Sequence, residues 1–363
     1  MTSQSENLKV TVLMSVYNSE NYLREAIESI LTQTFTDFEF IIINDFSTDN
    51  SMKIIGSYQD SRIRLVHNNK NLGLAASLNR GIDLANGEYI ARMDSDDISL
   101  PTRLAKQVVF MDKNPNVGIC GTWYKMFGES SGIVVRCSTD PAILKSGSLF
   151  NSMIGHSSVM MRKELLKKYN LYYDPSYKKA QDYELWSRAS KKFDFANIGE
   201  ILLLYRVHKS QMTQCSFDEQ VQLADKVRLS LLKDLGIYPT EEEFSIHQIL
   251  SSSIRMFLQT YRYNKVRNLL EKADKWLCNL KLANDKRSIY SEPAFSEILL
   301  ERWFVLCIKF MIKGFISFKL VCPPEILKRS QLGYGYIFNF LFKSLITGMR
   351  YTQPVLRYHV MKK

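Results

Sequence analysis

Strand-like and helix-like patterns of apolar residues alternate over residues 10–93 of the chain. Runs of β-branched and other apolar residues predict buried strands at 10–16, 38–43, 63–66 and 88–93. Apolar residues spaced three and four apart predict helices at 23–31, 52–55 and 74–85. Ser19 is expected to cap the first helix, and Ser47 or Thr48 the second. Strands joined by helices of this length indicate βαβ units and a largely parallel sheet, an α/β fold.

The pattern changes further along the chain. A helix is expected to begin near Pro101, and a second helix is expected at 182–192. Short strands are expected at 117–122, 133–135, 157–161 and 201–207. Beyond Cys215 helical spacing dominates, most clearly at 226–235, 244–258 and 266–282. This change predicts an α/β domain over 1–215 and a helical domain over 216–363.

Polar clusters follow three of the predicted strands. They are Tyr17 and Asn18 after the first strand, Asp45 after the second, and Asp94, Asp96 and Asp97 after the fourth. Because ligands of open parallel sheets bind beyond the carboxyl ends of the strands, the clusters are expected to share one site. Three carboxylates this close repel one another without a cation, and oxygen-only ligands favour Mg²⁺ or Mn²⁺. The alternative is a solvated acidic turn in which Asp97 caps a short helix.

Composition and charge exclude one class of protein and suggest a partner. Hydrophobic residues make up 45% of the 363 residues and charged residues 23%, which excludes a wholly disordered chain. The net charge is +11, and the segment 301–363 holds eleven Lys and Arg against two Glu. Aromatic residues lie among these bases, which favours an anionic membrane surface as partner, while packing within the protein is the alternative. No RNA- or DNA-binding motif accompanies the charge, so no nucleic-acid partner is expected.

The start of the chain and its cysteines bear on the compartment. The first ten residues, MTSQSENLKV, lack a basic region followed by an apolar core, so no secretory signal is expected. No uncharged apolar run reaches the roughly 18 residues of a membrane-spanning helix. The six cysteines form no CxxC pair, which favours free thiols in a reducing compartment. We therefore expect a cytoplasmic protein.

An ordered set of motifs carries a family resemblance. The motifs are Val10–Asn18 (VTVLMSVYN), Gln33–Phe35 (QTF), Ile43–Asp49 (INDFSTD), Asn71–Gly73 (NLG), Gly87–Asp97 (GEYIARMDSDD), Pro101–Leu104 (PTRL), Gln181–Trp186 (QDYELW) and Tyr205–His208 (YRVH). In this order, over about residues 8–215, they resemble the family 2 inverting glycosyltransferases of bacterial surface polysaccharide and lipooligosaccharide synthesis. The resemblance implies a GT-A fold with a helical extension behind it.

The resemblance also implies a role for each matching residue. On the nucleotide side, Tyr17 would stack on the base, Asp45 would hydrogen-bond it, Asp94 would lie near the ribose, and Ser15, Asn18 and Asn71 would line the same site. Asp96 would ligate Mn²⁺ or Mg²⁺ on the diphosphate with help from His208, Arg206 would face the diphosphate, and Asp182 would be the general base. His156 and Trp186 are assigned to the acceptor side.

Structural alternatives stand beside several of these roles. Asp182 could cap the helix that follows it, His208 could be a surface or core histidine, and Trp186 could belong to the core. For Arg103, a salt bridge on a helix face is the favoured interpretation. Three positions depart from the family pattern: Asn44 replaces an aspartate, Phe46 replaces a glycine, and Gln181 replaces a glutamate. The change at Gln181 removes a charge that would raise the pKa of Asp182.

The implied function is the inverting transfer of a sugar from a nucleotide-sugar donor, expected to be a UDP-sugar, to a hydroxyl of a glycan or glycolipid acceptor. Such a transfer needs one base and no second, nucleophilic carboxylate. It would take place on the inner face of the cytoplasmic membrane, with the protein peripheral to it. A sugar nucleotidyltransferase is the first alternative, but the stretch Ser15–Ser19 lacks the glycine and basic residues of its phosphate loop. An inactive nucleotide-sugar-binding scaffold is the second, suggested by Phe46 and Gln181.

Overall fold

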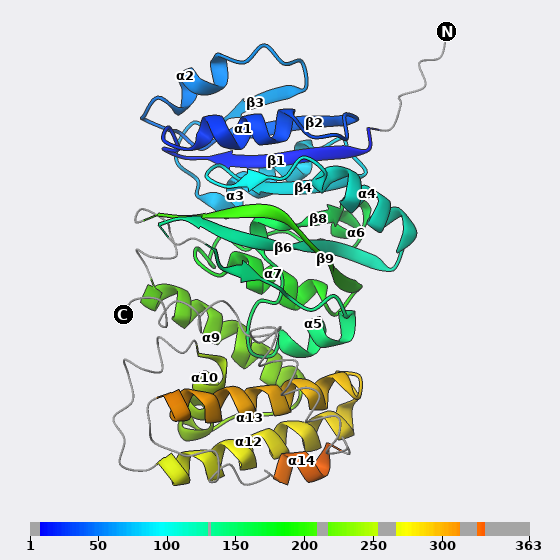
Figure 1. The fold of residues 1–363 in the computed structure, drawn as a ribbon, viewed down its shortest axis with the longest axis vertical. Helices are drawn as coiled ribbons and strands as arrows, with labels where there is room; N and C mark the ends of the chain where they lie inside the picture. The colour runs from blue at the N-terminus through cyan, green and yellow to red at the C-terminus, as the bar shows by residue number, and fades with distance from the viewer. Residues whose placement is uncertain (1–7, 130–131, 209–216, 253–265, 313–324, 331–363) are drawn as a thin grey trace. The chain divides into compact units, whose positions relative to one another are not determined.

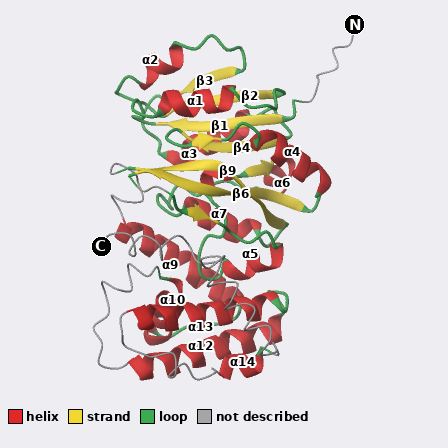
Figure 2. Ribbon diagram, in the orientation of Figure 1, coloured by secondary structure: helices red, strands yellow, loops and turns green. Residues whose placement is uncertain are grey.

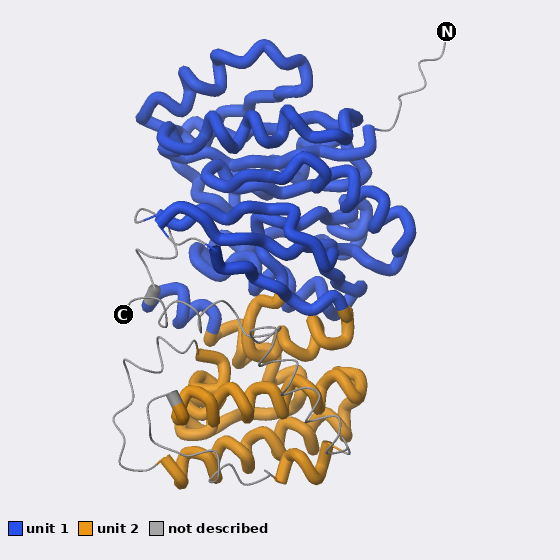
Figure 3. The backbone as a smooth tube through the Cα atoms, in the orientation of Figure 1, with its two compact units in different colours: residues 1–139, 154–224 blue, residues 140–153, 225–363 orange. Residues whose placement is uncertain are grey.

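The computed structural model describes residues 8–129, 132–208, 217–252, 266–312 and 325–330, and the chain forms two compact units (Figure 3). The first unit comprises 1–139 and 154–224, and the second comprises 140–153 and 225–363. The sequence pattern gave no sign that 140–153 belongs with the helical part. The reason lies in long-range contacts: helix α5 (Pro141–Gly147) packs against α13 (Ala294–Ile312), and His247 donates to the carbonyl of Leu149 at 3.1 Å.

A nine-stranded sheet forms the centre of the first unit, in the order β3-β2-β1-β4-β8-β6-β9-β5, with β7 paired to β6 (Figure 1). The strands of one half are β1 (Val10–Val16), β2 (Phe38–Asn44), β3 (Ile63–His67) and β4 (Tyr89–Asp94). All of these pair in parallel, with Ser15 of β1 opposite both Ile43 and Asp94. The predicted mainly parallel α/β sheet is thereby confirmed, and the ends of β1, β2 and β4 lie at one edge.

The other half of the sheet is mixed. Its strands are β5 (Ile98–Ser99), β6 (Val117–Gly128), β7 (Val134–Val135), β8 (Met160–Arg162) and β9 (Asp194–Val207). β8 is antiparallel to both β4 and β6, whereas β6 and β9 are parallel. β6 and β9 are longer than their apolar runs predicted, because their ladder continues past register shifts near Trp123. The expected strand at 157–161 begins instead as a 3-10 turn over His156–Ser158.

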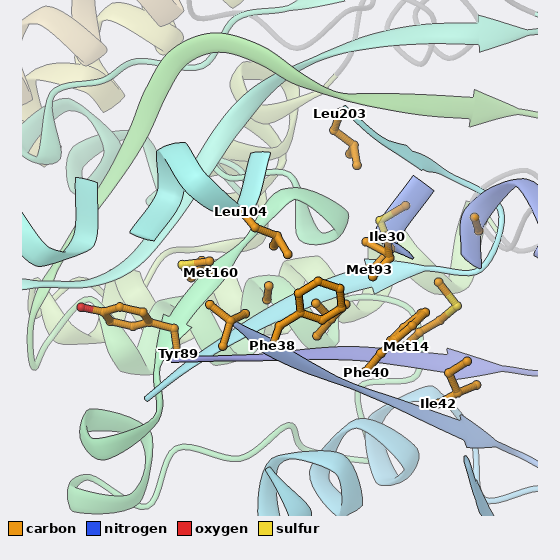
Figure 4. Packing of buried hydrophobic residues seen from close by; sticks show 14 of the residues in the cluster. Met14, Ile30, Phe38, Phe40, Ile42, Tyr89, Met93, Leu104, Met160 and Leu203 are labelled. Atoms are coloured by element: carbon orange, nitrogen blue, oxygen red, sulfur yellow. The ribbon is translucent and has the colours of Figure 1, made fainter. Parts of the chain in front are cut away.

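Helices cover both faces of this sheet. They are α1 (Leu23–Leu31), α2 (Ser51–Gly56), α3 (Leu74–Leu84), α4 (Arg103–Lys113), α6 (Lys163–Lys168) and α7 (Gln181–Ala189). Side chains alternate between faces along a strand, so Met14 and Phe40 join a core with Ile30 of α1 and Leu104 of α4 (Figure 4). Leu13 points to the opposite face, where Gly81 of α3 lets the helix approach closely.

Two helix starts differ from the expected caps. The N-cap of α1 is Tyr22, without a side-chain bond, while Ser19 contributes its backbone carbonyl to Leu23. The N-cap of α2 is Asn50, not Ser47 or Thr48. The hydroxyls of Ser19, Ser47 and Thr48 instead form hydrogen bonds between loops at the edge of the sheet.

The part of the second unit that the structure describes is helical (Figure 2). Besides α5 and α13, its helices are α10 (Glu241–Ser251), α12 (Val266–Arg287) and α14 (Glu325–Arg329), and α9 (Phe217–Asp234) crosses from the first unit into it. A capping box formed by Thr240 and Glu243 begins α10. Glu243 donates its backbone N–H to the Thr240 hydroxyl at 3.3 Å, and its carboxylate accepts from the Thr240 backbone.

Helix α13 contains the first part of the basic, aromatic segment for which a membrane contact was considered. Trp303, Leu306 and Phe310 are buried in this unit. Lys309 is also buried, and its ammonium donates to the carbonyls of Ile249 and Ser252 at the end of α10, at 3.1 and 2.7 Å. Over 301–312 the packing alternative therefore describes the segment. The rest of it, 313–324 and 331–363, lies outside the described residues.

Among the residues described, no helix combines the length and apolar character needed to cross a bilayer. The described cysteines Cys120, Cys137, Cys278 and Cys307 are free thiols, as expected.

Candidate active site at the carboxyl edge of the sheet

The end of β4 brings three carboxylates together. Asp94, Asp96 and Asp97 each offer one oxygen, and these oxygens lie within 4.8 Å of one another. Asp97 is completely buried, and its Oδ2 has no hydrogen-bond partner among the described residues. An oxygen-only set with an unsatisfied buried acceptor fits a hard divalent cation such as Mg²⁺ or Mn²⁺. Burial, followed by the charges of Asp96 and Asp94, raises the pKa of Asp97 well above its usual value.

A buried arginine beside this cluster, Arg92, was missed by the sequence analysis. Arg92 forms a bidentate pair with Asp94, through an Nη1–Oδ2 hydrogen bond of 2.6 Å and a second bond from Nη2 to Oδ1. Burial raises the pKa of Asp94, and the charge of Arg92 opposes that rise. The guanidinium of Arg92 therefore orients the Asp94 carboxylate at the end of β4. Arg92 was overlooked because it stands within an apolar strand. The one signal in the sequence is Asp94, two positions later, with which it pairs.

The favoured interpretation of Arg103, a salt bridge on a helix face, is wrong. The side chain is fully buried and donates to the carbonyls of Arg92 and Val159, at 2.7 and 3.3 Å. Its Nε donates to Gln107 at 3.0 Å. Burial, with a further contribution from the charge of Arg92, lowers the pKa of Arg103 to about 10. Arg103 thus ties α4 to the backbone that carries Arg92 and to the carbonyl of Val159.

His208 and Asp96, predicted from the motif order to act together, lie in contact. His208 Nε2 is 3.0 Å from Asp96 Oδ2, and the imidazole packs on the ring of Tyr22 at a centroid distance of 4.7 Å. The histidine follows the end of β9, whereas Asp96 follows β4, so the fold alone brings them together. His208 can therefore orient Asp96, or contribute a nitrogen beside it, when a cation is bound.

Arg206 lies in the same region but points differently from the expectation. Its guanidinium lies between the rings of Tyr22 and Phe127, 4.6 and 4.3 Å from their centroids. It donates to the carbonyl of Asp96 at 2.7 Å and pairs with Glu25 at 2.9 Å. The side chains of Tyr22, Phe127 and Glu25 thus hold the Arg206 guanidinium against the turn that carries Asp96.

Asp182 stands in the first turn of α7, after an N-cap at Ala180 that makes no side-chain bond. It is therefore not the N-cap residue that the structural alternative required. Burial raises the pKa of the Asp182 carboxyl, opposed by a backbone hydrogen bond and the charge of Arg92. Its own charge contributes to the raised pKa of Asp94, which places the two carboxyls in one electrostatic environment. Gln181 beside it is buried and neutral. Desolvation therefore raises the pKa of Asp182, an effect that was expected from a glutamate neighbour.

The loops after β1, β2 and β3 meet at Asp45. This carboxylate is buried and accepts from the backbone N–H groups of Leu72 and Gly73, at 2.8 Å each, and from the Asn68 amide at 2.7 Å. Asn71, which was assigned to the nucleotide, is exposed in the same loop. Asp45 thus fixes the position of the Asn71–Gly73 loop beside the end of β2.

Asn18 and Tyr17 lie next to this point. Asn18 donates its backbone N–H to Ser47 Oγ at 3.1 Å, and its Oδ1 accepts from the backbone of Thr48 at 2.8 Å. The asparagine thus ties the first loop to the second, while Tyr17 is left 51% exposed. Ser19 Oγ reaches Ser95 Oγ at 2.7 Å, which connects the Tyr17 loop to the acidic turn. Ser15 lies opposite Asp94 in the ladder between β1 and β4.

The two residues assigned to the acceptor side lie in an aromatic cluster. His156 Nε2 is 2.8 Å from the hydroxyl of Tyr173, and burial followed by the charge of Arg92 lowers the pKa of His156 well below its usual value. Trp186 is only 2% exposed and packs edge-on against Tyr173 and Phe195. This burial favours the core alternative for Trp186, since a sugar cannot stack on a covered ring.

Comparison with known proteins agrees with this geometry. Residues 11–169 match the profile of the family described as Glycosyl transferase family 2. An uncharacterised glycosyltransferase of Haemophilus influenzae is 31% identical over 304 residues, covering 80% of this chain and 91% of that protein. The chain belongs to glycosyltransferase family 2.

Named relatives and solved structures extend the comparison. The Escherichia coli enzyme WfaP, a UDP-Glc:α-D-GlcNAc-diphosphoundecaprenol β-1,3-glucosyltransferase, is 28% identical over 230 residues, covering 63% of this chain and 87% of that enzyme. The S. aureus TarS 1–349 structure in complex with UDP-GlcNAc superposes with a TM-score of 0.56 at 16% identity, covering 85% of this chain and 89% of that one. At this identity TarS shows the fold alone, a GT-A-like α/β arrangement.

Proposed function

We propose that this glycosyltransferase is a metal-dependent, inverting enzyme that transfers a sugar from a UDP-sugar to a hydroxyl of a lipid-linked glycan. The observation that carries the proposal is the convergence of the Asp94, Asp96 and Asp97 oxygens within 4.8 Å at the end of β4. Asp182 shares the electrostatic environment of that cluster. This reaction needs at least two kinds of group: carboxylates that bind the cation, and one further carboxylate that accepts a proton.

Asp96 is the residue we assign to the cation, with Asp94 and Asp97 beside it and His208 orienting its carboxylate at 3.0 Å. A bound Mn²⁺ or Mg²⁺ would neutralise the negative charge that gathers on the departing diphosphate. Tyr17 and Asp45 are assigned to the nucleobase, and Ser15, Asn18 and Asn71 to the walls of that subsite. Arg206 acts through Asp96, because its guanidinium contacts the Asp96 backbone carbonyl.

Asp182 is assigned as the general base that accepts the proton of the acceptor hydroxyl. Its raised pKa moves the carboxyl toward the operating pH, which makes it a better base. In an inverting transfer the acceptor oxygen then bonds to the anomeric carbon as the bond to the diphosphate breaks. The neutral imidazole of His156 is assigned to the acceptor side, whereas the burial of Trp186 leaves it a supporting role.

The acceptor and the location rest on relatives. WfaP is described as acting on a diphosphoundecaprenol-linked sugar, and we propose an acceptor of that class, presented at the inner face of the cytoplasmic membrane. The catalytic domain would comprise 1–215 and the helical domain 216–363, with 140–153 contributed to the helical unit. A membrane contact would involve the basic residues beyond Ile312. Binding to vesicles with and without anionic lipid, by the full chain and by a chain ending at residue 312, tests that contact.

Calorimetric titration with UDP tests the donor site. We expect binding in the presence of Mn²⁺, loss of binding after chelation, and loss in Asp96→Ala. Asp194→Ala, which removes an exposed carboxylate at the start of β9, serves as the control and is expected to bind like wild type. Wild-type binding that is unaffected by chelation would reject metal dependence, and the absence of binding to any nucleoside diphosphate would reject the donor site.

A further inference from the structure

We propose that Phe46 contacts the nucleobase of the donor and helps to select it, a role that rests on the proposed nucleotide-sugar transfer. Phe46 has a backbone φ of +66°, in the left-handed region that favours glycine, and its side chain is 51% exposed. A bulky residue in this region is strained, and such strain persists where the surroundings impose it and is concentrated at functional sites. Packing of the ring does not explain the strain, because half of the side chain faces solvent.

Phe46 is one of three exposed apolar side chains grouped around Asp45. Tyr17 is 51% exposed and Leu72 41% exposed. The backbone N–H of Asp45 donates to Val16, which precedes Tyr17, at 2.8 Å, and the Asp45 carboxylate accepts from Leu72 at 2.8 Å. Phe46 itself follows Asp45. Three loops that are linked through Asp45 thus each carry one exposed apolar side chain.

The position of the acidic cluster indicates what these side chains would cover. A diphosphate held at the end of β4 lies beside β1, since Ser15 is opposite Asp94, and β2 is the next strand, since Ser15 is also opposite Ile43. Two strand spacings are about 10 Å, which leaves room for a ribose between the diphosphate and the base. The base would therefore arrive at the loops that carry Tyr17 and Phe46. Flat bases stack on aromatic rings whatever their hydrogen-bonding pattern.

The loop geometry explains how Phe46 is held in this conformation. Ser47 donates its backbone N–H to Asn44 Oδ1 at 3.2 Å, and its hydroxyl accepts from Asn18 at 3.1 Å. The residues on either side of Phe46 are therefore fixed, Asp45 by the Leu72–Gly73 loop and Ser47 by Asn44 and Asn18. The family pattern has glycine at this position, which adopts a positive φ without strain, and the phenylalanine adds an aromatic ring there.

The test compares a ligand that has a base with one that lacks it. Calorimetry on the full chain would measure the affinities for UDP and for inorganic pyrophosphate, both with Mn²⁺, in wild type, Phe46→Gly and Phe46→Trp. Loss of a base–aromatic stack weakens binding about 5- to 100-fold, so Phe46→Gly is expected to lose that much UDP affinity. Pyrophosphate affinity should not change in Phe46→Gly. Phe46→Trp keeps an aromatic ring and should therefore retain UDP binding. The thermal midpoint of Phe46→Gly should equal or exceed that of wild type, because glycine accepts the positive φ.

A matched control is Tyr238→Ala, which removes an aromatic side chain that is 75% exposed in the helical unit, and it should leave both affinities unchanged. Equal UDP affinity in wild type and Phe46→Gly would overturn the inference. So would an equal loss for UDP and pyrophosphate, which would make Phe46 a support of the acidic turn, or an effect confined to the KM for the acceptor. If wild type binds none of UDP, dTDP, GDP and ADP, the proposed function fails, and that result is distinct from the others.

Discussion

Arg206 donates its backbone N–H to Asp97 Oδ1 at 2.8 Å and thereby links the end of β9 to the turn after β4. The same residue donates from its guanidinium to the carbonyl of Asp96 at 2.7 Å. One arginine therefore holds two residues of the acidic turn, Asp97 through its backbone and Asp96 through its side chain. The Asp96 carboxylate, which contacts His208, is not used by this arginine in either bond.

Arg206→Ala is expected to lower the free energy of unfolding by about 2–4 kcal/mol and to weaken Mn²⁺-dependent UDP binding. Hydrogen bonds to a charged group contribute about 1.5–3 kcal/mol each, and the cation also packs between two rings. Urea unfolding and calorimetry measure the two effects. Glu25→Gln is the control, because the Glu25 side chain is 54% exposed and an exposed ion pair contributes less than about 1 kcal/mol. Unchanged UDP affinity in Arg206→Ala would show that the turn holds its shape without this arginine.

Asp182→Asn is expected to lower the transfer rate about 10²- to 10⁴-fold while leaving Mn²⁺-dependent UDP binding intact, because only proton transfer is lost. Because burial raises the pKa of Asp182, the acidic limb of the wild-type rate profile should lie above pH 3.8, with activity lost as the pH falls through the raised pKa. Initial rates across pH measure this limb. A rate for Asp182→Asn equal to that of the Asp194→Asn control would remove Asp182 as the base.

The same substitution has an expected effect on stability. A carboxyl whose pKa is raised in the folded state favours folding when it is protonated and loses that contribution as the pH rises through the raised pKa. At neutral pH the ionised Asp182 therefore destabilises the fold, and Asp182→Asn should unfold at an equal or higher urea concentration than wild type. A clearly lower midpoint would mean that the carboxylate makes structural bonds that outweigh its desolvation.

Lys309 predicts a pH dependence in the helical unit. Burial, followed by the charge of Arg302, lowers the pKa of Lys309 to about 7. The folded state therefore disfavours the charged lysine, so wild type should gain stability relative to Lys309→Met as the pH rises from about 7 toward 10.5, the value in the unfolded chain. The gain is at most about 1.4 kcal/mol per pH unit. Urea unfolding of both proteins at several pH values measures it, and parallel curves would contradict it.

Gly87 offers a steric prediction with a matched control. A Cβ at Gly87 would lie 2.3 Å from the backbone nitrogen of Thr11, closer than any real contact, in the strand that begins the sheet. Gly87→Ala is expected to lower the free energy of unfolding by about 1–3 kcal/mol. Gly56→Ala in α2 meets no atom within 4 Å and should be neutral or slightly stabilising. Similar urea midpoints for the two variants would contradict the prediction.

Features that depend on local pattern could be predicted from the amino-acid sequence. Strands such as Val10–Val16 and Phe38–Asn44 are apolar runs that only a buried strand explains, and their polar ends marked Asp45 and the Asp94–Asp97 turn. The ordered motifs indicated the family before any contact was known. These features are readable because each depends on neighbours within a few positions, where the chain itself fixes the spacing.

The contacts between side chains of different elements could be seen only in the folded protein. Arg92 and Arg103 look like ordinary strand and helix residues until their burial behind Asp94 is seen. The direction of the Arg206 guanidinium, the burial of Lys309 and the membership of 140–153 in the helical unit depend in the same way on remote partners. The bonds of Arg206 to Asp96 and of Lys309 to Ser252 join residues 110 and 57 positions apart, and local periodicity carries no record of such partners.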